Sequence, residues 1–328
     1  MTKIIDTFLF SEPHEKEALL IKFILGGEAI TEWVIVENEY TFQGEHKGVF
    51  AQQVLDSDER FAPFRDRIHL ISASLQHPPI DYTRKDIDTQ GMDSERRQRS
   101  LAQKYIVEKY GHETDVWVLL SDADEVIDFD SFPDNFTFLT TKLTAANDGL
   151  VQIPRRRFWY DYDNLWNAVR ATPIVTVQRL AQATGDMGMG LLRSDYIGAV
   201  PEWERTLVYE YSYCYNRESI LRKFRTFPHG GMTDDEISQS MRCNHIPISK
   251  FRNKKLDLHP ELWMEKVALD NHNAPRYVKN HLKTLRTNVI DDNYLANRKT
   301  DYPHLHRLSH RIGFFVKQLG KKILRTFK

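Results

Sequence analysis

Residues 115–126, DVWVLLSDADEV, decide the fold that this chain can adopt. Five apolar residues in succession, 116–120, predict a strand that is buried on both faces, as in parallel sheets covered by helices on both sides. The apolar run ends in three acids, Asp122, Asp124 and Glu125. Because ligands bind beyond the carboxyl ends of the strands in an open α/β sheet, these acids lie where a binding site is expected.

Asp122 and Asp124 form an Asp-x-Asp motif, with one residue between the two carboxylates. Two carboxylates this close repel each other unless a cation lies between them. Oxygen ligands of this kind favour Mg²⁺ or Mn²⁺, and such an ion commonly bridges a carboxylate to substrate phosphates. The motif therefore predicts a metal that holds a diphosphate. The alternative is an acidic turn that only ends a strand.

The composition excludes several classes of protein. The chain has 328 residues, of which 41% are hydrophobic, and 45 basic residues oppose 46 acidic ones for a formal net charge of -1. This balance gives no case for a nucleic-acid partner. Two cysteines, Cys214 and Cys243, are too few for a disulfide framework and favour a reducing compartment.

The N-terminal residues do not have the pattern of a targeting segment. No basic and then apolar signal sequence precedes the first strand-like run, and no apolar run approaches the roughly 18 residues that a membrane span needs. We therefore expect a cytoplasmic protein with one domain over residues 1–300, followed by a short tail.

The first forty residues predict a β-α-β unit. Residues 4–10 are typical of a strand, residues 12–25 have the apolar spacing of a helix that Gly26-Gly27 ends, and residues 33–36 are a second short apolar run. Such a unit implies parallel strands joined by a right-handed crossover. Glu37 then lies at a carboxyl end, next to the first strand.

Later segments extend the same pattern. We expect strands at residues 67–71, 149–154 and 207–215, and helices at 93–110, 132–145 and 216–225, with Ser94 and Asn216 as N-caps. Residues 233–236, Thr-Asp-Asp-Glu, fit a capping box. The sequence thus predicts an α/β fold with a mostly parallel central sheet flanked by helices.

Residues 155–160, Arg-Arg-Arg-Phe-Trp-Tyr, have two interpretations. Basic and aromatic side chains in succession can stack on and bind a sugar. The alternative is a packed sheet edge from which the arginines extend to solvent.

Five segments of the chain, taken in order, resemble glycosyltransferase family 17. They are DTFLF, WVIVENEYTFQGEHK, SERRQRS, DVWVLLSDADEV and YSYCYNRESILRKF, between Ile4 and His229. This is the family of the enzyme that adds the bisecting N-acetylglucosamine to N-glycans. The resemblance implies a GT-A fold, a UDP-sugar donor, Mn²⁺ or Mg²⁺ at the Asp-x-Asp motif, and inversion at the sugar carbon by direct displacement.

The resemblance also implies roles for individual residues. Asp124 would bind the metal, and Asp122 would face the donor ribose or reach the metal through water. Glu37 would accept the uracil N–H or a ribose hydroxyl. Glu95 and Arg99, one helical turn apart, would pair with each other or present Arg99 to the donor. Lys223 would counter the diphosphate charge, and His229 would be a second metal ligand or would donate to a phosphate. The alternative for His229 is an ordinary loop residue.

The chain departs from the family at two places. Residues 126–128 are Val-Ile-Asp where the family has Ile-Pro-Arg, and residues 208–210 are Val-Tyr-Glu where it has Gly-Trp-His. If that histidine helps to bind the donor, Glu210 leaves the sugar specificity open.

Inverting transfer needs a carboxylate that takes the proton from the attacking hydroxyl. Glu218, in the first turn of the helix expected at 216–225, matches a glutamate of the family and is our first candidate for this catalytic base. The alternative for Glu218 is an acid that only complements the helix dipole. Glu210, Glu202 and Glu204 are the reserve candidates.

Two other functions compete with sugar transfer. Asp122-x-Asp124-x-Val126 after an apolar strand also fits a haloacid-dehalogenase-type phosphatase, although the nucleophile of that class usually lies on the first strand of its domain. The third hypothesis is a non-catalytic domain that binds a glycan or a nucleotide.

The tail suggests a further partner. From Ile312 onward, apolar residues occupy one face of a helical projection and basic residues largely the other, and no acid follows Asp301. This pattern is typical of a helix that lies in an anionic membrane surface. The hypothesis is a peripheral contact with the inner membrane surface that brings the enzyme to a lipid-linked glycan acceptor. The alternative is a helix packed on the domain.

Overall fold

The computed structural model describes residues 2–77, 87–194, 200–227, 232–242, 264–270 and 273–289 of the chain. The strands are β1 (Lys3–Leu9), β2 (Glu32–Asn38), β3 (Ile68–Ala73), β4 (Val116–Leu120), β5 (Glu125–Ile127), β6 (Leu150–Trp159), β7 (Asn164–Thr176), β8 (Val208–Ser212) and β9 (Met264–Lys266). The α-helices are α1 (Lys16–Gly26), α2 (Ala51–Asp56), α3 (Ile87–Tyr110), α4 (Asn135–Thr144), α5 (Val177–Gln182), α6 (Gly188–Ser194), α7 (Arg217–Thr226), α8 (Asp234–Arg242) and α9 (Arg276–Leu285).

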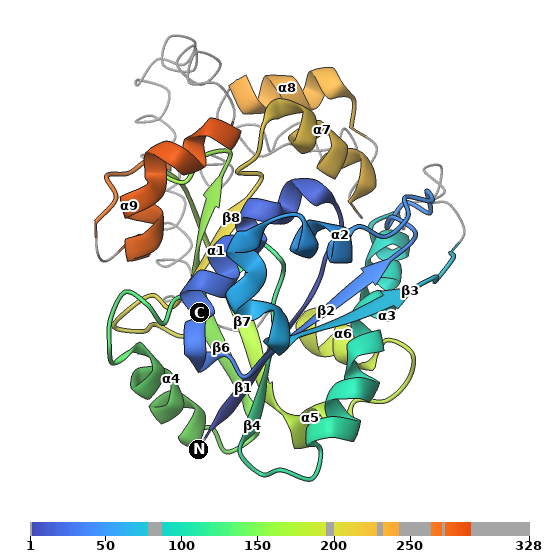
Figure 1. The fold of residues 1–328 in the computed structure, drawn as a ribbon, viewed down its shortest axis with the longest axis vertical. Coiled ribbons are helices and arrows are strands. Elements are labelled where there is room, and N and C mark those ends of the chain that lie inside the picture. Colours follow the sequence, from blue (N-terminus) through green and yellow to red (C-terminus); the bar gives the residue numbers. More distant parts are fainter. Residues whose placement is uncertain are drawn as a thin grey trace, which may run out of the picture.

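One sheet runs through the molecule in the order β3-β2-β1-β4-β7-β6-β8-β5, with β9 paired to β7 (Figure 1). The first four strands are parallel to one another, and so are β6 and β8. The pairs β4–β7, β6–β7, β5–β8 and β7–β9 are antiparallel. The predicted α/β class, with a central sheet flanked by helices, is confirmed.

Helices cover both faces of the parallel strands because alternate side chains point to opposite faces. Ile4, Phe8 and Trp117 face a core that contains Phe23 of α1. Ile5, Val118 and Leu120 face a different core, built with α3, α5 and α6. The five-residue run 116–120 is buried throughout, as its composition predicted.

The chain reverses its direction of travel across the sheet between β1 and β4. It passes from β1 through α1 to β2 and on to β3, and then returns through α3 to β4 on the other side of β1. In open α/β sheets, such a switch point leaves a crevice outside the carboxyl ends of the two strands, where ligands bind. The motif at residues 122–125 follows β4 directly and lies at this point.

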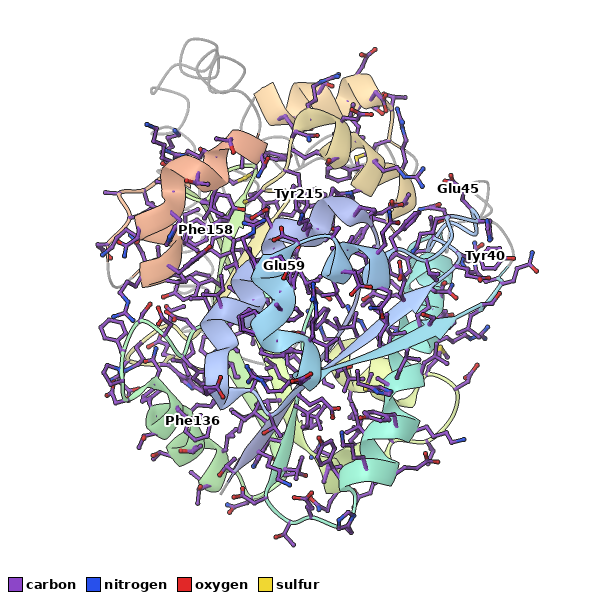
Figure 2. The ribbon with its side chains drawn as sticks, in the orientation of Figure 1. Tyr40, Glu45, Glu59, Phe136, Phe158 and Tyr215 are labelled. Carbon is purple, nitrogen blue, oxygen red and sulfur yellow. The ribbon has the colours of Figure 1, made fainter. Side chains whose placement is uncertain are left out.

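The basic and aromatic run at 155–160 lies inside the sheet. β6 is hydrogen-bonded to β7 on one side and to β8 on the other, so it is not an edge strand. Phe158, Trp159 and Tyr160 are at most 8% exposed. They belong to an aromatic core that also contains side chains of α7 and α9, and Figure 2 labels Phe158 within it. These rings pack the core, and the structure offers no exposed stacking platform at this run.

Local signals in the sequence differ in how well they located the helix ends. Asn216 caps α7 by accepting from the Ser219 amide at 2.9 Å, and Thr233 and Glu236 form the predicted capping box. The prediction that Ser94 is an N-cap is wrong, because α3 begins at Ile87 and Ser94 is buried within it.

β7, which has 13 residues, was not predicted as a strand at all. Within the described ranges, no helix combines the length and the apolar character that crossing a membrane requires. The predicted boundary at residue 300 and the basic tail lie outside the described residues.

Candidate active site

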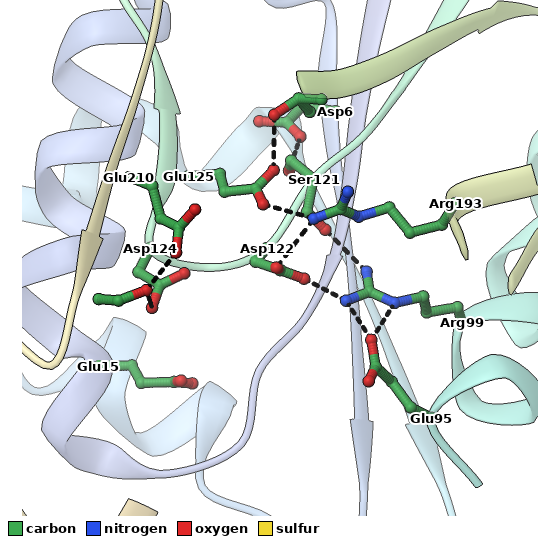
Figure 3. Close-up of polar contacts among 12 residues, drawn as sticks. Asp6, Glu15, Glu95, Arg99, Ser121, Asp122, Asp124, Glu125, Arg193 and Glu210 are labelled. Atoms are coloured by element: carbon green, nitrogen blue, oxygen red, sulfur yellow. Dashed lines mark hydrogen bonds and ion pairs between the residues drawn. The ribbon is translucent and has the colours of Figure 1, made fainter. Parts of the chain in front are cut away.

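The acidic motif lies in a short loop that joins the two parts of the sheet. β4 ends at Leu120, and β5 begins at Glu125 and runs antiparallel to β8, so Glu125 lies directly opposite Glu210. The carboxylates of both parts of the sheet therefore converge at one place (Figure 3).

Lys22 of α1 holds the loop between β4 and β5 in place. Its ammonium group donates to the carbonyl oxygens of Asp122 and Glu125, at 3.2 and 2.6 Å, and to the Ser121 hydroxyl at 2.8 Å. Its charge is met by Asp6 of β1 at 2.9 Å, and both side chains are completely buried. An apolar helix face carries this lysine because its hydrogen-bonding capacity is filled by the loop.

The Asp122 carboxylate lies between two guanidinium groups (Figure 3). Arg99 of α3 contacts one of its oxygens and also pairs with Glu95 at 2.8 Å, as the helical spacing predicted. Arg193 of α6 contacts the other oxygen at 3.0 Å. Burial alone would raise the pKa of Asp122, but Arg193 and Arg99 hold it well below its usual range.

Two further arginines meet the remaining acids of the loop. Glu125 is fully buried, contacts both Arg155 and Arg193, and accepts from the Thr172 hydroxyl at 2.8 Å. Glu210 forms ion pairs with Arg155 at 2.9 Å and Arg157 at 2.6 Å. Against the effect of burial, Arg157 and Arg155 lower the pKa of Glu210 to about 2.

Asp124 has a cation of its own. Lys223 of α7 donates to Asp124 Oδ2 at 2.9 Å and lies 3.4 Å from Glu15. The ammonium lies 5.3 Å from the ring centroids of both Tyr213 and Tyr215. Despite burial, which would lower it, the pKa of Lys223 is raised, chiefly by Asp124, so the lysine stays charged.

The position of Lys223 follows from the packing of α7. Phe224, its neighbour in the helix, stacks on Tyr213 with 4.4 Å between the ring centroids and 7° between the ring planes. Tyr213 has a φ of 60°, a backbone conformation that costs a non-glycine residue about 1–3 kcal/mol and persists only where the surroundings enforce it. The packing of Phe224 on this tyrosine thus positions α7, and α7 brings the Lys223 ammonium to Asp124.

A small pocket opens beside this cluster, at the carboxyl ends of the parallel strands. Apolar side chains at the ends of β1, β2 and β4 line the pocket, together with Met189. Its two charged lining residues are Arg99 and Arg193. The hydroxyl of Thr7, which is 2% exposed, also lines the pocket and has no hydrogen-bond partner among the described residues.

Two of the predicted site residues, Glu37 and Glu218, are not part of the ion-paired cluster. Glu37 is completely buried and caps α2, accepting from the amides of Phe50 and Ala51 at 2.7 Å, so its oxygens serve the fold. Glu218 is exposed in the first turn of α7. It precedes Lys223 by five residues, so the two side chains lie on different faces of the helix. His229 lies outside the described residues.

Three important residues were not predicted for this cluster. Arg155 and Arg157 alternate along β6, which places both on the face beside Glu210 of the neighbouring strand, and that alternation was a usable signal. Arg193 gave no local signal, because only the packing of α6 on α3 brings it to Asp122.

The donor set does not fit the predicted metal. Within the described ranges, no three His, Cys, Asp or Glu residues lie together in a way that could hold a metal ion. Both oxygens of Asp122 contact arginines, and Asp124 contacts Lys223. A divalent ion would have to displace these cations, so we derive no chemical step through a metal.

Comparison with known proteins adds only general similarity. No protein-family model and no curated protein matches the chain. Among solved structures, 4-diphosphocytidyl-2C-methyl-D-erythritol synthase has 12% identity and a TM-score of 0.32, over 65% of this chain and 89% of that chain. Two structures of LgtC, one an active-site mutant and one the galactosyltransferase with donor and acceptor sugar analogues, each have 9% identity and a TM-score of 0.30, over 70% of this chain and 84% of theirs. At such values, the function has to be argued from the site itself.

Proposed function

We propose that this chain is a glycosyltransferase that moves a sugar, N-acetylglucosamine or a related hexose, from a UDP-sugar to a hydroxyl group of a glycan or a lipid-linked glycan. The observation that carries the proposal is the convergence of Arg99 and Arg193, which both contact Asp122, on a small pocket at the switch point between β1 and β4. Buried guanidinium groups at the carboxyl edge of an α/β sheet suit a diphosphate. The five segments that resemble family 17 support the same reaction.

The proposed chemistry is a direct displacement. The acceptor oxygen forms a bond to the anomeric carbon of the donor as the bond from that carbon to the diphosphate oxygen breaks. UDP leaves with the electron pair, and the hydroxyl proton passes to a carboxylate of the enzyme. Because charge develops on the leaving diphosphate, cationic groups that are already in place lower the barrier. Arg193 and Arg99 are placed to supply that charge.

The catalytic base is best sought outside the ion-paired cluster. Glu210 is a poor acceptor of a proton at neutral pH, because its pKa is near 2 and both of its oxygens lie against arginines. Glu218 lies on another face of α7 from Lys223, but it is exposed and forms no ion pair with the described residues, so its carboxylate is open to an acceptor hydroxyl. We therefore propose Glu218 as the base for the displacement.

A donor screen tests the proposal. The full chain is incubated with UDP-, GDP- and CMP-sugars, with and without Mn²⁺, and release of the nucleoside diphosphate or monophosphate is measured. We expect turnover with a UDP-sugar that the Asp124→Asn variant loses, while Asp148→Asn, at a largely exposed acid, keeps it. Turnover of a generic aryl phosphate with Mg²⁺ would favour a phosphatase. Absence of turnover with every donor would favour a binding domain.

A further inference from the structure

The carboxylates of the motif are already neutralised by side chains. Four acids, Glu95, Asp122, Glu125 and Glu210, interleave with four arginines, Arg99, Arg155, Arg157 and Arg193. Alternating charges at ion-pair distance leave no excess of negative charge that would demand a metal. The repulsion between Asp122 and Asp124 that led us to expect a divalent ion is thus relieved in another way.

The charge of Asp124 is also neutralised by a side chain. The ammonium of Lys223, whose side chain is 11% exposed, lies 2.9 Å from Asp124 Oδ2. Helix α7 and the two tyrosine rings fix that position. A divalent ion beside the same oxygen would repel the lysine at close range.

Arg193 has an N–H donor that is free to bind a ligand. One of its terminal nitrogens reaches Asp122 and Glu125, while its Nε–H is buried with no partner among the described residues. A buried donor without a partner costs about 1–3 kcal/mol, which a ligand oxygen would recover. The unpartnered hydroxyl of Thr7 lines the same pocket. Two unmet donors beside a guanidinium charge form a site for an anionic oxygen.

From these contacts we propose that the site binds the diphosphate of its donor without a divalent metal, with Arg193 and Thr7 as direct contacts. Asp122 and Asp124 then hold Arg193, Arg99 and Lys223 in place rather than a metal ion. This inference rests on the proposed function, since it concerns the donor of that reaction. It reverses the role that the sequence predicted for the Asp-x-Asp motif.

Titration calorimetry of the full chain with UDP, in excess chelator and again with Mn²⁺, tests the inference. We expect dissociation constants that agree within about threefold. Binding that appears only with Mn²⁺, or that strengthens by roughly tenfold or more with it, would overturn the inference and leave the proposed function standing. If UDP binds under neither condition, the proposed function itself fails, and the inference fails with it.

Two substitutions sharpen the test. Arg193→Gln should weaken UDP binding in chelator by roughly tenfold or more, the usual worth of a hydrogen bond to a charged group. Arg179→Gln, at an arginine of α5 that pairs with the exposed Asp148, is the matched control and should leave the affinity unchanged. Equal affinity in all three proteins would contradict the assignment of Arg193.

Lys223→Met distinguishes a cation that stands in place of a metal from one that only packs. This variant frees the Asp124 carboxylate, so UDP affinity in chelator should fall and added Mn²⁺ should restore part of it. A variant that loses affinity with no rescue, or keeps wild-type affinity, would contradict the role given to Lys223. Circular dichroism of each variant verifies the fold, and Arg193→Lys, which keeps the charge, serves if Arg193→Gln does not fold.

Discussion

Arginine is the residue that makes this cluster possible. The guanidinium of Arg193 reaches Asp122 and Glu125 at once, and that of Arg99 reaches Asp122 and Glu95. A planar fork with five N–H donors can join two carboxylates, whereas a lysine acts as a single point of charge. We infer that the arginines order the acids as much as the acids order the arginines.

Removing the Glu218 carboxylate should lower turnover without changing the binding of the donor. Glu218→Gln removes a proton acceptor but no contact with the ion-paired cluster, so we expect turnover to fall by roughly two orders of magnitude while UDP affinity stays nearly constant. Glu108→Gln, at an exposed acid of α3 paired with Lys104, is the control. Near-normal turnover of Glu218→Gln would place the base elsewhere, and Glu210 would be examined next.

His14 should make the stability of the protein depend on pH. Burial, and then the charges of Lys223 and Arg222, lower the pKa of His14 to about 3. Between that value and the ordinary 6.5, the unfolded chain binds a proton that the folded protein does not, so stability is lost as the pH falls through this range.

The slope contributed by His14 is at most about 1.4 kcal/mol per pH unit. Urea unfolding at pH 7, 6 and 5 should therefore show a weaker pH dependence for His14→Gln than for the wild type. Identical slopes for the two proteins would mean that the imidazole is protonated in the folded state.

At the scale of elements, α1 supports the loop between β4 and β5 through one buried lysine. Lys22→Met leaves the Asp6 carboxylate buried without its cation, although the Ser121 hydroxyl still donates to it at 2.6 Å, and the loss of the cation costs about 3–5 kcal/mol. Lys3→Met, at a surface pair with Glu113, should cost about 1 kcal/mol or less. Urea unfolding measures both. The double variant Asp6→Leu with Lys22→Met should recover part of the loss, and a cost below about 1 kcal/mol for Lys22→Met alone would refute this role.

The seating of α6 on α3 sets the position of Arg193. A Cβ added at Gly190 would lie 2.4 Å from both the Cα and the carbonyl oxygen of Arg96, so the two helices would have to separate. We expect Gly190→Ala to destabilise the protein by about 1–3 kcal/mol and to weaken UDP binding by moving Arg193 away from Asp122.

Asp186→Ala, in the exposed connection just before α6, is the control for Gly190→Ala. Calorimetry with UDP and thermal unfolding measure the two effects. Wild-type affinity in Gly190→Ala would show that Arg193 reaches its place independently of this contact.

Elements with a strong local pattern were predictable. The buried run 116–120 became β4 with the bounds that its composition indicated, and Asn216 and the Thr233–Glu236 box marked helix starts correctly. Ser94 misled because a residue that favours caps is also tolerated within a helix, where it packs or bonds locally. The long β7 was missed because its tryptophan, proline and arginine residues give no clear alternation.

At the scale of the whole molecule, residues 121–125 connect β4 of the parallel part of the sheet to β5 of the mixed part. The sequence placed the acids at a strand end, and that much of the site could be predicted from pattern alone. It could not pair them with their cations, because Arg193 and Lys223 follow about 70 and 100 residues later and reach the loop only through tertiary packing. His229 and the basic tail lie outside the described residues, so their predicted roles stay predictions.

The most direct measurement is hydrogen–deuterium exchange of the full chain with and without saturating UDP. If the diphosphate binds at the switch point, amides in the end of β1, in residues 121–125 and in α6 should gain protection, since ligand binding suppresses local opening. Peptides from α4, which lies beside the N-terminus of the chain in Figure 1, should not change. Protection that is absent, or that falls outside these three segments, would contradict the account.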